Sequence, residues 1–255
     1  MFFIQLPPTD TLPAVVQKLN SLFENDSVDP NYDYIEYLAD GRGFTFGKVG
    51  FTTATGDGFD IIREYTESVK DSKLVYYVDV LKKLARKHSD DTTDLVGFAD
   101  AWRSEAQKTK YFQDKVSFEL YGKPAIDYCQ LLGLKSTLAL AIVYDAIVQH
   151  GDGKDKDGIR KIFKHTIKSV GGTPSGRTHK DKRCDEMPDS EILFLEAFLQ
   201  SRREILEDAH DDDSREEWQK SVGRVDVFKG LLDSKNLDLK MPLQIVSEEW
   251  NAVIK

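Results

Sequence analysis

Residues 138–148 read Leu-Ala-Leu-Ala-Ile-Val-Tyr-Asp-Ala-Ile-Val, the longest apolar stretch in the chain. Apolar side chains cover nearly every face of a helix predicted over 135–149, so we expect this helix to run through the middle of the protein. The stretch is about half as long as the roughly 20 residues that a membrane-spanning helix needs. The sequence therefore predicts a long central helix inside a protein without a membrane span.

One charged side chain, Asp145, interrupts this apolar helix. Burying a carboxylate without a partner is costly, so we expect an arginine beside it. The candidate arginines flank a strongly acidic segment and are Arg202, Arg203 and Arg215. The alternative is that Asp145 lies on a partly hydrated edge and has no partner.

Outward from the central helix, the spacing of apolar residues predicts a mainly α (α+β) fold. A first helix over 14–23 is expected to end near 24–27. Short strands are expected over 34–38, 44–46 and 49–53, around a glycine-rich turn at 40–43. The remaining predicted helices cover 59–70, 73–87, 97–106, 108–120, 157–169, 189–208 and 214–234.

The composition is that of an acidic globular protein. The 255 residues carry 44 Asp and Glu against 35 Lys and Arg, a formal charge of −9, and 40% are hydrophobic. A chain of this length forms one large domain or two lobes. The charge argues against nucleic-acid or anionic-membrane partners, because Lys and Arg drive phosphate binding. A cationic ligand is the better match.

No motif indicates a cofactor or a metal. The chain lacks GxxxxGK[ST], HExxH and GxSxG, and the run 152–158 has lysines where a calcium loop needs oxygen ligands. Cys129 and Cys184 are too few for a disulfide framework and have no zinc spacing.

His150, directly after the central helix, is either a cleft residue or a helix C-terminal cap. Segment 171–188 is predicted to be a basic surface loop.

Acidic and aromatic residues concentrate between Glu24 and Asp60. Eight acids against two bases give this segment a balance of −6, and seven aromatic residues are interleaved with them. Aromatic faces and carboxylates are the materials of a carbohydrate cleft, although a solvated hairpin with some core aromatics would read similarly. Glycosidic cleavage needs one protonated and one ionised carboxyl, and Glu24 and Asp40 are candidates. Alternatively, Glu24 only ends its helix and Asp40-Gly41 only forms a turn.

Several segments in one order resemble a known family. The N-terminal ones are Phe23-Glu24-Asn25, Tyr34-Ile35-Glu36, Asp40-Gly41-Arg42-Gly43-Phe44-Thr45 and Gly50-Phe51-Thr52-Thr53-Ala54-Thr55-Gly56-Asp57. Downstream follow Asp90-Asp91-Thr92, the run from Tyr144 to Gly153, His210-Asp211, Arg224-Val225-Asp226-Val227 and Asn236-Leu237-Asp238-Leu239. Together they resemble the chitosanases of glycoside hydrolase family 46, particularly the Bacillus-type members, over nearly the whole chain. One departure is Ala39, which stands where many members have glycine.

The resemblance implies a fold and a set of site residues. The fold would be lysozyme-like, with residues 1–255 forming a single catalytic domain of two lobes and the substrate cleft between them. Glu24 matches the general acid, Asp40 the general base, and Thr45 a residue that positions water. The implied substrate-binding residues are Tyr34, Glu36, Arg42 and Asp57, to which we add His150. The implied buried ion-pair network is Asp145, Arg202 and Arg215.

The expected activity is endo-hydrolysis of β-1,4-linked glucosamine polymer, chitosan, with inversion and without a cofactor. Inversion requires the two carboxyls to be about 6.5–9.5 Å apart or more. Alternatives are a lysozyme-like hydrolase of chitin or peptidoglycan, and a non-catalytic binder of cationic polysaccharide. The family implies an extracellular protein, although the start of the chain has no basic region typical of a secretion signal. We expect a monomer.

Overall fold

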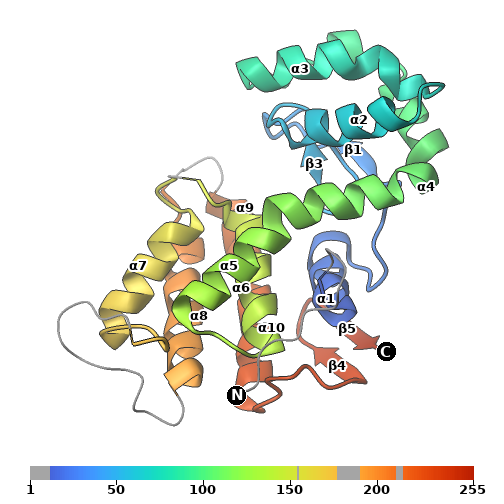
Figure 1. Ribbon diagram of the computed structural model, residues 1–255. Coiled ribbons are helices and arrows are strands. Elements are labelled where there is room, and N and C mark those ends of the chain that lie inside the picture. Colours follow the sequence, from blue (N-terminus) through green and yellow to red (C-terminus); the bar gives the residue numbers. More distant parts are fainter. Residues whose placement is uncertain (1–11, 154, 177–189, 211–214) are drawn as a thin grey trace. The chain divides into compact units, whose positions relative to one another are not determined.

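The structure, a computed structural model, describes residues 12–153, 155–176, 190–210 and 215–255 (Figure 1). The chain divides into two compact units. The first unit comprises the residues up to Phe23 together with Tyr121–Lys255, and the second comprises Glu24–Leu120. Both units are mainly helical, and each contains one small antiparallel sheet. The predicted fold class is confirmed. Among the described residues, no helix is long and apolar enough to cross a bilayer.

The first unit is built around α6, Thr137–His150. Every side chain from Leu138 to Ile147 is buried, so the helix is enclosed on all sides as its sequence predicts. Ser136 caps its first turn by accepting a hydrogen bond from the Ala139 N–H at 3.0 Å. The helix packs against α5 (Lys123–Leu132), α7 (Ile159–Val170) and α10 (Val222–Asp233).

Two further helices and a hairpin complete the first unit. Helix α8, Ser190–Glu207, packs against α7, α10 and the short helix α9, Arg215–Lys220. Strands β4 (Leu243–Val246) and β5 (Asn251–Ile254) pair antiparallel. The prediction over 214–234 was wrong in one respect, because α9 and α10 are separate helices. Helix α5 and the β4–β5 hairpin were not predicted. Of the predicted basic loop, residues 177–188 lie outside the described part of the chain.

Helix α1, Ala14–Asn25, contributes to both units. Its apolar residues are buried as their spacing predicts, including Val16, Leu19 and Leu22. The contacts of its residues up to Phe23 belong to the first unit, whereas Glu24 and Asn25 belong to the second. The last turn of this helix is therefore where the chain enters the second unit.

The second unit contains a three-stranded sheet and a long helix. Strands β1 (Ile35–Tyr37), β2 (Phe44–Phe46) and β3 (Phe51–Thr52) pair antiparallel in the order β1-β2-β3. The helices are α2 (Asp57–Ser68), α3 (Val78–Lys87) and α4 (Phe98–Ser117), with 3-10 turns at Lys73–Tyr77 and Thr93–Leu95. Helix α4 is continuous where two helices were predicted, and it runs on into a π-helical turn, Phe118–Gly122.

Aromatic packing holds this sheet against α4. The Phe46 ring contacts Trp102 and Phe98 edge to face, with centroids 4.8 and 5.4 Å apart, and all three side chains are fully buried. The Trp102 indole N–H donates to the Tyr34 carbonyl at 3.0 Å, just before β1 begins. The sheet thus has one face fixed on a rigid helix, which leaves the other face for the site.

Candidate active site

The strand register gathers polar side chains on the face of the sheet opposite the aromatic core. Glu36 on β1 lies opposite Thr45 on β2, and Thr45 lies opposite Thr52 on β3. Side chains alternate between faces along a strand, so these three residues form one row across the sheet. Phe46, next to Thr45, points to the other face and into the core. The alternation of FTF in β2 therefore sets the direction of the Thr45 hydroxyl.

Thr45 carries a buried hydroxyl without a hydrogen-bond partner in the described part of the protein. The residue is 7% exposed. Its methyl group faces Gly50, where a Cβ atom would lie 3.3 Å from it. Buried polar atoms nearly always have a partner, and water is the usual one where protein groups are missing. The hydroxyl is therefore suited to hold a water molecule, and the water-positioning role that the family resemblance implies for Thr45 stays a prediction.

Asp40 lies in the turn between β1 and β2 and pairs with Arg42. Its Oδ1 accepts the Arg42 backbone N–H at 3.0 Å, and its Oδ2 accepts Nε at 2.8 Å and a terminal guanidinium nitrogen at 2.6 Å. Partial burial raises the pKa of Asp40, but the hydrogen bonds and charge of Arg42 outweigh it, so the pKa lies below its ordinary value. Asp40 is thus kept ionised, as a general base must be.

The backbone before Asp40 is strained. Ala39 has φ +56°, in the left-handed region that L-residues avoid, and Gly41 has φ +78°. Glycine would adopt the Ala39 conformation without this penalty. The departure noted in the sequence at Ala39 therefore has a cost in backbone energy within the candidate site.

Tyr34 and Glu36 form a second polar pair on the same hairpin. The Tyr34 hydroxyl donates to Glu36 Oε2 at 3.0 Å. Burial, this hydrogen bond and the charges of Glu36 and Asp40 raise the pKa of Tyr34 to about 12. The structure brings Tyr34, Glu36 and Asp40 within electrostatic reach of one another, which makes this surface strongly acidic.

Asp57 begins helix α2 and has a structural role in the sheet. Its Oδ1 accepts hydrogen bonds from the Thr52 N–H, the Thr55 hydroxyl and the Gly58 N–H, at 3.2, 2.6 and 2.8 Å. A carboxylate is favourable at a helix N-terminus because unpaired N–H groups face it. Asp57 thus ties β3 to α2, and its predicted contact with substrate stays a prediction.

Glu24 is exposed in the last turn of α1, and its neighbours on both sides are fixed. On one side, an Arg224 guanidinium nitrogen lies 3.4 Å from the Phe23 carbonyl, to which it donates. On the other side, the Asn25 side-chain amide donates to the Lys48 carbonyl at 3.1 Å. Lys48 follows Thr45 by three residues. Glu24 is the first residue of the second unit, and the next residue, Asn25, is hydrogen-bonded to the β2–β3 turn of that unit.

Asp145 in α6 has two arginine partners, so the predicted ion pair is confirmed. Arg202 of α8 lies 2.7 Å from one carboxylate oxygen and Arg224 of α10 lies 3.3 Å from the other. Asp145 and Arg202 are almost completely buried. The prediction for Arg215 needs correction: its guanidinium donates to the Ala209 carbonyl, and Arg224 takes the expected place beside Asp145.

The sequence contains a signal that places Arg224 on a buried helix face, although Arg224 was not among the predicted partners of Asp145. Arg224 lies four residues before Phe228, on the apolar stripe of α10, so a helix places it on the buried face. An arginine on such a stripe needs a buried carboxylate, and Asp145 is the one that α6 supplies. Arg203, the third candidate, instead pairs with Asp226 and Glu207 on the surface.

His150 is buried at the end of α6, and its predicted contact with substrate stays a prediction. The Arg202 Nε donates to His150 Nε2 at 3.2 Å, which leaves Nδ1 to donate to the Asp157 carbonyl at 2.8 Å. Burial and the charge of Arg202 hold the His150 pKa well below its ordinary value. The ring borders a pocket of about 310 Å³ that Trp218 and His210 also line.

Among the residues that the structure describes, no group of three or more His, Cys, Asp or Glu side chains is arranged to hold a metal ion. Cys129 is buried, and burial raises the pKa of its thiol. The sheet and its first turn carry an ionised carboxylate, Asp40, and a buried hydroxyl suited to water, Thr45. Glu24 is an exposed carboxyl at the end of helix α1. Such groups are of the kind that acid–base hydrolysis of a glycosidic bond uses.

Comparisons with known proteins give the family. The model of glycosyl hydrolase family 46 matches residues 18–243. A chitosanase of Bacillus subtilis (strain 168) is 40% identical over 242 residues, 94% of this chain and 83% of that protein. The chain therefore belongs to glycosyl hydrolase family 46, a family of glycosidases.

Solved structures also match over almost the whole chain, and two of them have sugar oligomers bound according to their descriptions. One is a mutant chitosanase from Bacillus subtilis MY002 complexed with 6 GlcN, with a TM-score of 0.86 and 40% identity over 95% of this chain and 97% of that one. The other is a Gynuella sunshinyii GH46 chitosanase with chitotetraose, with a TM-score of 0.85 and 33% identity over 98% of each chain.

Proposed function

We propose that this protein is an endo-acting chitosanase that hydrolyses β-1,4 linkages between glucosamine units with inversion of anomeric configuration. The observation that carries the proposal is the Asp40 turn beside Thr45. Arg42 keeps Asp40 ionised, and Thr45 on the adjoining strand has a buried hydroxyl available to water. A carboxylate and a water-binding hydroxyl are what a base-activated attack by water requires.

In this mechanism Glu24 is the general acid and Asp40 the general base. Asp40 takes a proton from water while the water oxygen bonds to the anomeric carbon. The glycosidic bond breaks, and its oxygen takes the proton of Glu24. Water attacks from the face opposite the leaving group, which inverts the configuration, and we expect the two carboxyls about 6.5–9.5 Å apart or more.

The charge of the segment supports a cationic substrate. Glu24 to Asp60 carries −6 of the overall −9, and glucosamine polymers carry one amine per unit. The names of the relatives agree, since each is a chitosanase and one structure contains 6 GlcN. Tyr34, Glu36 and Asp57 are proposed to bind glucosamine units. Arg42 is proposed to act on Asp40 and on substrate.

The test is product analysis on fully deacetylated chitosan, with the anomeric configuration read by NMR in the first minutes. We expect soluble oligomers whose new reducing ends are α. New ends that begin as β would overturn inversion. Digestion of acetylated chitin or of peptidoglycan, with deacetylated polymer left intact, would overturn the substrate assignment.

Variants test the two carboxyls. Glu24→Gln and Asp40→Asn should each lower kcat by about 10² to 10⁴-fold, the usual contribution of a general acid or base. Glu67→Gln, on exposed α2 surface, is the matched control and should retain full activity. Substantial turnover of chitosan by Glu24→Gln with an unchanged fold would refute the role of Glu24.

We also propose that the protein acts outside the cell as a monomer, with its two units forming one catalytic domain. A polymer such as chitosan is too large to enter a cell, so its hydrolase must meet it outside. Light scattering during gel filtration should give about 29 kDa, the mass of one chain. Activity confined to the cell interior of the source organism, or a dimer mass, would contradict these proposals.

A further inference from the structure

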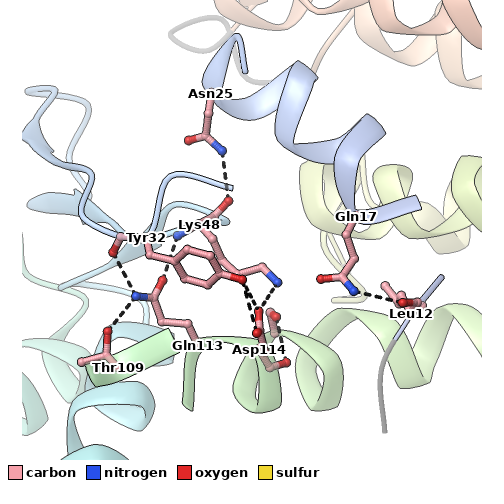
Figure 2. A network of polar contacts seen from close by, with 9 residues as sticks. Leu12, Gln17, Asn25, Tyr32, Lys48, Thr109, Gln113 and Asp114 are labelled. Atoms are coloured by element: carbon pink, nitrogen blue, oxygen red, sulfur yellow. Dashed lines mark hydrogen bonds and ion pairs between the residues drawn. The ribbon is translucent and has the colours of Figure 1, made fainter. Parts of the chain in front are cut away.

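Lys48, in the turn after β2, is a buried lysine at the centre of a polar network (Figure 2). Its ammonium group lies 2.6 Å from Asp114 Oδ1 on helix α4, and its side chain is 5% exposed. The Tyr32 hydroxyl donates to both oxygens of Asp114, at 3.0 and 3.3 Å. Desolvation of a lysine is costly, and the charge of Asp114, itself hydrogen-bonded by Tyr32, offsets part of this cost. The turn is thereby anchored on α4.

The backbone of Lys48 is fixed from two sides as well. Its N–H donates to Gln113 Oε1 at 3.0 Å, and its carbonyl accepts the Asn25 amide at 3.1 Å. Gln113 is itself held, because its amide donates to the Tyr32 carbonyl and to the Thr109 hydroxyl, at 2.9 and 2.8 Å. Figure 2 shows the resulting path from α4 through Lys48 to Asn25.

Gly47 permits this arrangement. It has φ +74°, and a Cβ at this position would lie 2.6 Å from Gln113 Oε1. A side chain here would push Gln113 out of the contact with the Lys48 N–H. Glycine at this position therefore allows the turn both to reverse the chain and to pack closely against Gln113 of α4.

We propose that Asn25 is a positioning residue for the general acid, with Lys48 and Asp114 as its anchor. The inference rests on the role proposed for Glu24. Asn25 is the last residue of α1, where backbone carbonyls lack helical partners and the chain frays unless side chains fix it. Its amide ties the Glu24 backbone to the hairpin that carries Thr45. The acid and the water-binding hydroxyl are thus held on one rigid frame.

Substrates with different leaving groups separate positioning from mere stability. Cleavage of a glucosamine oligomer needs the acid, whereas a nitrophenyl β-glycoside of the same oligomer releases a stable phenolate without protonation. Asn25→Ala should lower kcat on the oligomer by about 10- to 100-fold, as small misplacements of reacting groups do, with KM little changed. It should lower kcat on the nitrophenyl glycoside by less than about threefold, because the base side is intact.

Asn25→Asp keeps the volume of the side chain but removes the donor, so it should show the same selective loss. Ser27→Ala, two residues further along, is the matched control; it removes a local hydrogen bond to the Asp29 N–H and should change neither rate. Equal losses of Asn25→Ala on both substrates, or no loss on either, would overturn the proposal.

The role of Glu24 is tested separately by the same pair of substrates. Glu24→Gln should lose the oligomer reaction and keep most of the nitrophenyl reaction. If Glu24→Gln behaves in this way and Asn25→Ala does not, only the positioning proposal fails. If Glu24→Gln still cleaves the oligomer, the proposed general acid is wrong.

Discussion

Arg42 donates three hydrogen bonds to the carboxylate of Asp40. Two guanidinium N–H groups donate to Oδ2 at 2.8 and 2.6 Å, and the backbone N–H donates to Oδ1 at 3.0 Å. All three bonds favour the charged form of the carboxylate. They form within a turn of three residues, so the ionised state of Asp40 does not depend on distant parts of the fold.

Removing the hydrogen bonds from Arg42 should shift the acidic limb of the plot of log kcat against pH. A general base works only when ionised, so the rate falls as pH drops below its pKa. Because Arg42 lowers the pKa of Asp40, Arg42→Ala should raise it and shift the acidic limb of log kcat to higher pH. Arg63→Ala, which breaks a pair with Asp60, should leave the limb in place. If the acidic limb does not shift in Arg42→Ala, protonation of Asp40 is not what causes the rate to fall at acid pH.

The strain at Ala39 predicts a stabilising substitution. A left-handed alanine costs about 1–2 kcal/mol, and glycine loses about 0.5–1 kcal/mol more backbone entropy on folding. Ala39→Gly should therefore raise the free energy of unfolding by up to about 1 kcal/mol, measured by urea denaturation.

The opposite substitution at Gly41 is its control. Gly41→Ala should destabilise by about 1 kcal/mol through the backbone alone, because a Cβ there meets nothing within 4 Å. A loss of stability in Ala39→Gly would contradict this prediction and show that packing of the Ala39 side chain outweighs the backbone strain.

The buried ion pair should be costly to break. Arg202→Ala leaves Asp145 in a dry core with only Arg224, so we expect a loss of about 3–5 kcal/mol in unfolding free energy. The matched control is Arg203→Ala, whose partner Asp226 is on the surface, and it should cost at most about 1 kcal/mol. If Arg202→Ala does not fold, adding Asp145→Asn should restore part of the stability. Equal effects at Arg202 and Arg203 would contradict the burial argument.

The buried carboxylate of Glu105 should contribute to the loss of folding stability at acid pH. Its carboxylate is buried and accepts hydrogen bonds from Tyr65, Ser72 and the Lys73 N–H, at 2.8, 2.7 and 2.7 Å. Burial raises its pKa, but the hydrogen bonds outweigh it and the folded-state pKa lies below the ordinary value.

A lowered folded-state pKa stabilises the protein above the ordinary glutamate pKa, and this stability is lost as pH falls through the folded value. Glu105→Gln should therefore lower the melting temperature at neutral pH, and its difference from the unaltered protein should shrink on acidification. Glu67→Gln, on the surface, is the control and should follow the unaltered protein. A difference for Glu105→Gln that stays constant with pH would contradict the linkage.

Parts of the fold with a strong local pattern were predictable. The all-apolar run of α6 indicated a buried helix, and the spacing of α1 indicated its buried face. The two helices predicted over 97–106 and 108–120 are the single helix α4. Near the predicted break, Thr109 is buried and bonds to the Ala106 carbonyl and to the Gln113 amide, contacts that the spacing of apolar residues does not reveal. Helix α5 and the β4–β5 hairpin are short elements whose stability comes from packing on their neighbours, a signal that local sequence does not carry.

The sequence by itself determined the turn chemistry of Asp40-Gly41-Arg42, the buried position of Asp145 and its need for an arginine, and the family resemblance. Only the tertiary structure decided which arginines meet Asp145, that the Thr45 hydroxyl is buried without a protein partner, and that Asn25 reaches Lys48. The reason is distance along the chain: Arg224 lies 79 residues from Asp145 and Lys48 lies 23 residues from Asn25. Such contacts depend on how helices and turns pack, whereas a turn is fixed by the conformations its own residues can adopt.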